Sequence, residues 1–170
     1  MFAAHTSIGY LSTKLALKYS SHQEMRNKAY FFGVLGSVFP DIDLFWFYSL
    51  GQRAVHHHNY ITHKPLAWLL IIIPVITYLL VKKSKWSIVA ICFFGNVMLH
   101  IITDTIVGNI HWLWPFVKGG TTLVAVTTRH DFWVYNFLDH WTFNIEIGII
   151  LFTLYILIKS ISKSSIDSKI

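Results

Sequence analysis

The chain has 170 residues, of which 54% are hydrophobic and only 13% are charged. Soluble domains of this length carry about a quarter charged residues, so this composition excludes an ordinary soluble domain and predicts a membrane protein. The formal net charge of +6 would suit nucleic acid, but the basic residues fall between apolar stretches, and no nucleic-acid partner is expected. Cys92 is the single cysteine, which leaves His and carboxylate side chains as the ligands for any metal.

The apolar segments predict an all-α integral membrane bundle of about five membrane-associated helices. Residues 4–20 and 29–39 are short for a bilayer crossing of about 20 residues, which suits a hairpin that enters the bilayer only in part. Residues 65–81 and 86–107 form the clearest spans, with Pro74 inside the first. A long loop follows from Gly108 to about Phe137, and the last span runs from about 138 to 158. Residues 1–160 are expected to form one domain and residues 161–170 a polar tail.

The basic residues predict the orientation of this bundle. Ten of them lie near one set of helix ends and four near the other, which makes the first set cytoplasmic by the positive-inside rule. The carboxyl terminus is then cytoplasmic and the amino terminus outside. No basic residue precedes the first apolar stretch, so no cleavable signal peptide is expected. The first set is Lys14, Lys18, Arg26, Lys28, Lys82, Lys83, Lys85, Lys159, Lys163 and Lys169, and the second is Arg53, Lys64, Lys118 and Arg129.

Histidine and acidic residues from separate segments are expected to meet at the outer end. His100 and Asp104 are four residues apart and share a helical face. Ionisable groups at membrane depth are costly and mark a functional site by default, although a His–Asp pair can also serve only to hold two helices together. The predicted metal ligands are His5, Asp41, Asp43, His58, His63, His100 and Asp104.

Imidazoles and carboxylates suit a divalent cation, with zinc the first choice and manganese an alternative. Seven ligands are many for one zinc, so one or two ions are expected. Asp43, Asp139 and Glu146 are candidates for a catalytic acid or base, with Asp139 and Glu146 expected on one face of the last helix. Orientation of a metal-bound histidine or plain hydrogen bonding between helices are the other roles open to Asp139 and Glu146.

These motifs resemble those of the YdjM-like family of bacterial inner-membrane proteins, described as membrane-bound metal-dependent hydrolases. The resemblance covers about residues 1–116. Asn59 and Lys64 stand where the family loop usually has Arg and Ser. The motif order is more distantly similar to zinc-dependent phospholipase C, whose later His-x3-Glu pair is not found. The matching motifs are His5, the segment from Gly36 to Asp43, His58 with Thr62-His63, His100 with Asp104, and Trp114-Pro115.

The resemblance implies a multi-pass protein of the bacterial inner membrane that hydrolyses a phosphoester or ester of a lipid or other envelope substrate. Metal-activated water would be the nucleophile, on the extracytoplasmic side, with membrane lipids as neighbours. Two alternatives stay open. The same residues could form the pathway of a metal-ion or proton transporter or channel, which needs polar groups in the cytoplasmic half as well. They could also form a metal staple without catalysis.

Overall fold

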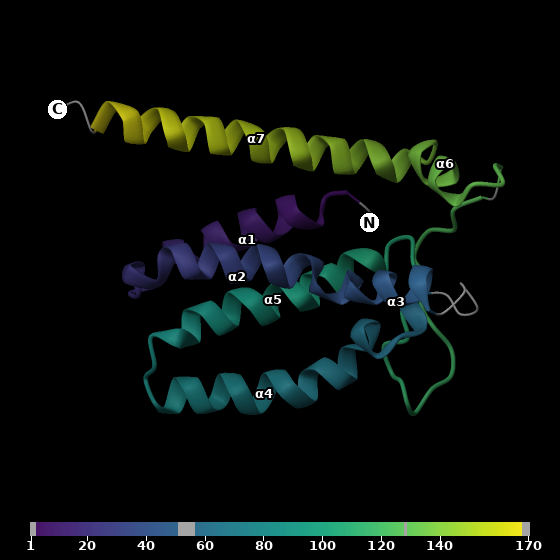
Figure 1. Ribbon diagram of the computed structural model, residues 1–170, viewed down its shortest axis with the longest axis horizontal. Helices are drawn as coiled ribbons and strands as arrows, with labels where there is room; N and C mark the ends of the chain where they lie inside the picture. Colours follow the sequence, from purple (N-terminus) through teal and green to yellow (C-terminus); the bar gives the residue numbers. More distant parts are fainter. Residues whose placement is uncertain (1–2, 51–56, 128, 168–170) are drawn as a thin grey trace.

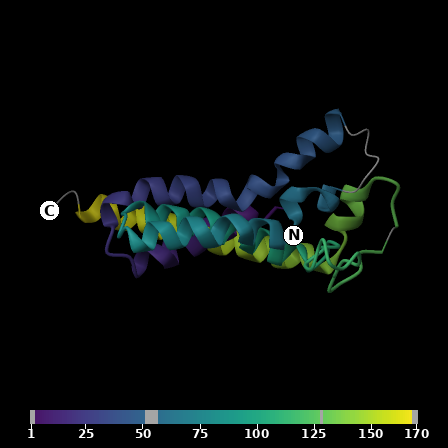
Figure 2. The same ribbon diagram turned by 90° about the horizontal axis from the view of Figure 1, so that it is seen from below.

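The computed structural model describes residues 3–50, 57–127 and 129–167, and confirms the predicted helical membrane bundle. Long helices run back and forth, so their ends gather at two opposite ends of the molecule (Figures 1 and 2; Figure 2 gives the perpendicular view). The α-helices are α1 (His5–Lys18), α2 (Arg26–Val38), α3 (Asp43–Ser49), α4 (Pro65–Val81), α5 (Trp86–Asp104), α6 (Trp133–Leu138) and α7 (Trp141–Asp167). Short 3₁₀ turns are η1 (Gln23–Met25), η2 (Phe39–Ile42), η3 (His57–Asn59) and η4 (Ile61–His63).

Helices α1, α2 and α5 form the centre of the bundle, with α4 against α5 and α7 against α1 (Figure 1). Close packing of the central helices depends on glycine. A Cβ on Gly33 would lie 3.1 Å from Asn96 Nδ2, and one on Gly36 would lie 2.9 Å from the Phe93 carbonyl carbon. Gly33 and Gly36 therefore allow the close helix approach that small residues give in membranes.

The interior of the bundle changes from apolar to polar along its length. At the end that holds the α1–α2 turn, the buried side chains are mainly apolar, although Ser87 is buried there too. Near the middle, Asn96 donates from Nδ2 to the Gly9 carbonyl oxygen at 3.3 Å and to Thr13 Oγ1 at 3.1 Å. Beyond it lie the histidines and aspartates. The apolar cluster comprises Leu17, Met25, Ala29, Ile88, Val89 and Cys92.

Three helical stretches are long and apolar enough to cross a membrane: Gln23–Ser49, Trp86–Asp104 and Trp141–Ser162. Helix α4 is apolar over 17 residues. The prediction that the second helix is too short is wrong, because η1, α2, η2 and α3 continue one another over 27 residues despite Pro40. Pro is tolerated there because it begins a new helical turn, where its missing N–H costs nothing. Helix α1, with 14 residues, is as short as predicted.

The last helix differs from its predicted bounds at both ends. It begins at Trp141 rather than near Leu138, because Leu138 closes the separate helix α6. It continues to Asp167, so most of the predicted polar tail is helical. No Gly or Pro follows Gly148 in the sequence, and serine and lysine alone do not end a helix.

The long loop after α5 folds back over the end of that helix. Ile110 and Thr121 pair in an isolated antiparallel bridge. Leu123 N donates to the Thr105 carbonyl oxygen at 2.9 Å, and Val124 N donates to the Ile106 carbonyl oxygen at 2.8 Å. The loop therefore covers the end of the bundle at which α5 stops.

Candidate metal centre

The ends of four segments bring histidine and aspartate side chains together. His5 opens α1, Asp41 and Asp43 follow α2, His63 precedes α4, and His100 and Asp104 end α5. These helix ends lie at one end of the bundle in Figure 1, near the N-terminus and α3. Of these histidine and aspartate side chains, all except Asp41 are buried. The alternating directions of the helices explain the convergence, since every second connection returns the chain to this end.

Asp104 is the centre of the cluster. Its Oδ2 lies 3.1 Å from His100 Nε2, 3.5 Å from His58 Nε2 and 3.6 Å from His63 Nε2. Its Oδ1 lies 3.1 Å from His5 Nε2. Four imidazoles from three parts of the chain therefore surround one buried carboxylate, which is far more than a structural ion pair needs.

Asp41, His63, His100 and Asp104 have the spacing of a metal-ligand set. Their donor atoms all lie within 4.8 Å of one another. His63 Nε2 lies 3.4 Å from His100 Nε2, and Asp41 Oδ1 lies 3.7 Å and 3.5 Å from these two nitrogens. A tetrahedral zinc with bonds of about 2.0–2.1 Å separates its ligand atoms by about 3.4 Å. The donor set therefore fits a small divalent cation without rearrangement.

The other nitrogens of two of these histidines are held by acceptors. His63 Nδ1 lies 2.7 Å from Asp43 Oδ2, and His100 Nδ1 lies 2.7 Å from the Ser37 carbonyl oxygen. Because both oxygens only accept hydrogen bonds, each Nδ1 carries the proton. A neutral imidazole then directs an Nε2 lone pair into the cluster. Metal-binding histidines are oriented in this way, by a carboxylate or carbonyl behind the ring.

Burial lowers the pKa of His63, but the Asp104 and Asp43 carboxylates outweigh it and raise this pKa above its usual value. The strongly negative surroundings that hold a proton on the ring are equally suited to a divalent cation. Burial lowers the pKa of His58 to about 4, so its ring is neutral near pH 7, the form in which histidine binds a metal.

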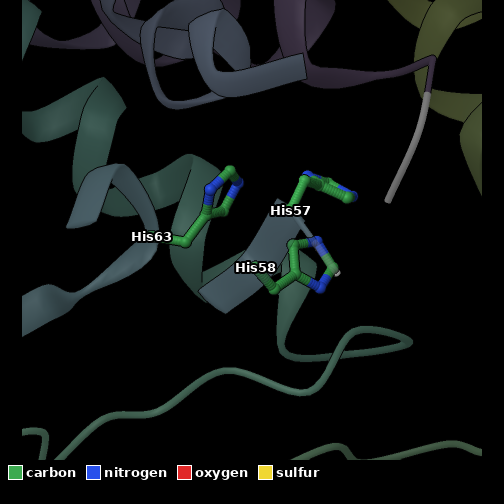
Figure 3. A group of neighbouring side chains, drawn as sticks. All are labelled: His57, His58 and His63. Carbon is green, nitrogen blue, oxygen red and sulfur yellow. The ribbon is translucent and has the colours of Figure 1, made fainter. Parts of the chain in front are cut away.

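A second group of donors adjoins the first. His57, His58 and His63 come together from η3 and η4 (Figure 3), with their candidate ligand atoms within 4.8 Å of one another. Asp43 Oδ1 is buried without a hydrogen-bond donor among the described residues, and its nearest ionic neighbour is His57 Nδ1 at 3.7 Å. A buried carboxylate oxygen of this kind is costly unless a cation is near. Asp41, Asp43 and His57 form a further possible ligand group.

The two acidic candidates of the last helix do not share a face. Asp139 follows α6 and is exposed, and its Oδ2 pairs with His130 Nε2 at 2.7 Å. Since α7 begins two residues later, the predicted helical alignment of Asp139 with Glu146 is wrong. Glu146 is fully buried on α7, where its Oε2 accepts from Ala3 N at 2.6 Å and Ala4 N at 3.0 Å. This carboxylate caps the start of α1 and so holds the backbone beside His5.

Three contributors to the site were not among the predicted ligands. His57 adjoins the predicted His58, and the density of histidines there was its only sequence signal. The Ser37 carbonyl oxygen gives no signal at all, because any residue has one. Lys64 is 4% exposed, and its Nζ donates to the His58 carbonyl oxygen at 3.3 Å. Burial lowers the pKa of Lys64.

Membrane-spanning helices with buried histidines and aspartates at one end define an integral membrane protein with a candidate divalent metal centre. The family model described as YdjM inner membrane protein matches residues 1–166, so the chain belongs to this family and is an inner-membrane protein. No match was found among curated proteins or among solved structures.

Proposed function

We propose that the chain is a membrane-bound, metal-dependent hydrolase whose ion is held by His63, His100 and Asp104. One observation carries the proposal. The two Nε2 atoms lie 3.4 Å apart while both Nδ1 atoms are engaged by acceptors. Both Nε2 atoms therefore face the cluster beside two carboxylates, where a divalent cation would displace the proton that these carboxylates otherwise favour on His63. Zinc fits the nitrogen and oxygen donors, and manganese is the alternative.

The exposure of Asp41 favours a catalytic metal site over a purely structural one. It is the most exposed of the four donors, with 28% of its side-chain surface accessible, whereas Asp104 is at 4% and both histidines are at 0%. Solvent and substrate therefore reach the cluster beside Asp41. A bound divalent metal would lower the pKa of water at that position. Asp41 would then accept the proton of the attacking water, and Asp43 would keep the ring of His63 in place.

The surroundings of the cluster favour a substrate with an anionic or ester group at the membrane surface. The Lys64 ammonium is buried beside the histidines, and among the described residues its hydrogen-bond acceptor is a neutral carbonyl oxygen. Helix α3, which begins at Asp43, exposes Phe45 and Trp46. Aromatic side chains of this kind are enriched at the membrane–water interface. A phosphoester or ester of a lipid suits both features.

A transport pathway finds less support. The half of the bundle away from the histidines is closed by the apolar cluster around Leu17 and Ile88. The polar groups in the middle form hydrogen bonds with one another, since Asn96 Nδ2 donates to Thr13 Oγ1 and to the Gly9 carbonyl oxygen. Ions crossing the bilayer need polar groups or water along the whole route.

The test is the metal content of detergent-purified protein without a His-tag, compared with the double variant His100→Ala, Asp104→Ala. We expect about one or two equivalents of zinc or manganese per chain, lost in the double variant. The matched control is His130→Ala, Asp139→Ala, which removes an exposed His–Asp pair and should keep the metal. The metal-loaded protein is then assayed with bis-p-nitrophenyl phosphate and p-nitrophenyl acetate.

The results distinguish a hydrolase, a metal staple without catalysis and a protein without a metal site. Metal in the wild type and control, together with hydrolysis that a chelator abolishes, supports the hydrolase. Bound metal without hydrolysis of either class of ester supports a metal staple instead. A folded wild-type protein that takes up no zinc or manganese contradicts the proposal.

A further inference from the structure

A cavity of about 440 Å³ lies at the end of the bundle opposite the histidines, between α1, α2 and α7. In Figure 1 the α1–α2 turn lies at the end of the molecule toward which α7 runs to the C-terminus. No part of the proposed hydrolytic site reaches it. Gln23 closes one edge, because its Nε2 donates at 2.8 Å to both the Leu17 and the Ser20 carbonyl oxygens.

Three basic side chains line the cavity: Lys14 and Lys18 from α1, and Arg26 from α2. Within the described residues, none of the three forms an ion pair with an acidic side chain. Each lies over a tyrosine ring instead, with its charge 5.5–5.7 Å from the centroid. Among the described residues that line the cavity, none is acidic. Three positive charges at one mouth without a counter-ion call for an anionic ligand.

Apart from Gln23 and Tyr30, the rest of the lining is apolar. Leu11 and Leu15 of α1 and Phe152 and Ile156 of α7 line the cavity. Only 11% of the membrane-spanning stretch of α7 is buried, so this helix presents most of its surface to lipid. A ligand here therefore meets hydrocarbon along the helices and positive charge at their ends. That combination suits a lipid with a charged headgroup better than it suits a soluble anion.

We propose that this cavity binds a phospholipid with an anionic headgroup. The phosphate lies among Lys14, Lys18 and Arg26, and an acyl chain lies in the groove between α1 and α7. Basic pockets between membrane helices on the cytoplasmic side are the usual place for such headgroups, and each basic residue strengthens binding. The bound lipid lies between α7 and the rest of the bundle at this end, whereas at the other end Glu146 of α7 accepts hydrogen bonds from Ala3 N and Ala4 N.

The experiment is native mass spectrometry of the full chain in detergent, titrated with phosphatidylglycerol or phosphatidylcholine of identical acyl chains. We expect one phosphatidylglycerol to remain bound at collision energies that remove phosphatidylcholine. The triple variant Lys14→Gln, Lys18→Gln, Arg26→Gln should weaken phosphatidylglycerol binding about tenfold or more. The matched control, Lys82→Gln, Lys83→Gln, Lys85→Gln, removes the same charge from the α4–α5 turn at the same end of the bundle and should bind like the wild type.

Phe152→Ala tests the apolar wall separately and should weaken both lipids while preserving the preference for phosphatidylglycerol. Equal binding of the two lipids by the wild type would overturn the proposal. So would equal losses in the two triple variants, since general surface charge would then explain the effect. Displacement of phosphatidylglycerol by millimolar inorganic phosphate would show an anion site instead of a lipid site.

Discussion

At the scale of single residues, Asp43 is the most informative part of the candidate centre. Its Oδ2 accepts from both His63 Nδ1 and Thr62 Oγ1, so it orients the ring without needing to touch the ion. We expect Asp43→Asn to lower zinc affinity about 10–100-fold, because the acceptor behind His63 loses its charge. Competition with a chromophoric zinc chelator measures the change.

The control for that variant is Asp139→Asn. It alters the same type of group in a His–Asp pair, but in one that is exposed and belongs to another part of the chain. Unchanged zinc affinity in Asp43→Asn, or an equal loss in Asp139→Asn, would show that the carboxylate behind His63 has no orienting role.

The alternating helices predicted that the separate segments meet at one end of the bundle, but only local spacing could predict an individual contact. The His100–Asp104 contact at 3.1 Å follows from four-residue helical spacing. The contacts of Asp104 with His5 and His58 depend on the way in which α1, the η3 turn and α5 meet, which no local pattern specifies. The predicted alignment of Asp139 with Glu146 failed for the same reason. A seven-residue spacing places two side chains on one face only within a single helix, and the helix is interrupted between α6 and α7.

At the scale of helices, the packing of α2 on α5 positions the centre. Ser37, whose carbonyl holds His100, follows Gly36 directly, and Gly36 lies against the backbone of Phe93. Gly36→Ala would force the helices apart, since its Cβ would lie 2.9 Å from the Phe93 carbonyl carbon. We expect a loss of about 1–3 kcal/mol of stability and weaker zinc binding. Thermal unfolding in detergent and the zinc titration measure the two effects.

Gly95→Ala is the matched control, because beyond its own stretch of helix no heavy atom lies within 4 Å of the Cβ it would add. It also sits inside a helix, where alanine is favoured over glycine by about 1 kcal/mol. Equal or higher stability is therefore expected for Gly95→Ala. Gly36→Ala with unaltered stability and zinc affinity would mean that α2 and α5 tolerate separation.

Helix positions were predictable to different degrees. Helix α4 begins at Pro65 and ends at Val81 as predicted, because a proline and a basic turn bracket an apolar run. Helix α2 begins at Arg26, three residues before its predicted start, because Asn27 and Lys28 are polar but do not oppose a helix. The short helix α6 lies in a stretch with no helical periodicity, so only its tertiary surroundings fix it.

At the scale of the whole molecule, the bundle has two chemically different ends. One end collects His5, Asp41, His63, His100 and Asp104, while the other carries the basic α1–α2 and α4–α5 turns. Arg53 and Lys169, which entered the charge count, lie outside the described residues. Because alternate helix ends share one side of the membrane, we expect the two sets of residues to face opposite compartments. The excess of Lys and Arg at one set of helix ends thus predicts that the candidate centre and the basic cavity lie on opposite sides of the membrane.

This arrangement predicts that the metal centre faces outward and the basic turns face the cytoplasm. Ser49 ends α3 beside the centre and is exposed, whereas Ser84 lies in the α4–α5 turn at the other end. In a Cys92→Ala background, a membrane-impermeant maleimide added to cells with a permeabilised outer membrane should label Ser49→Cys and leave Ser84→Cys unlabelled. Inner-membrane permeabilisation should expose Ser84→Cys, which controls for its reactivity. Labelling of Ser84→Cys alone in cells with an intact inner membrane would show the opposite topology, with the candidate centre on the cytoplasmic side.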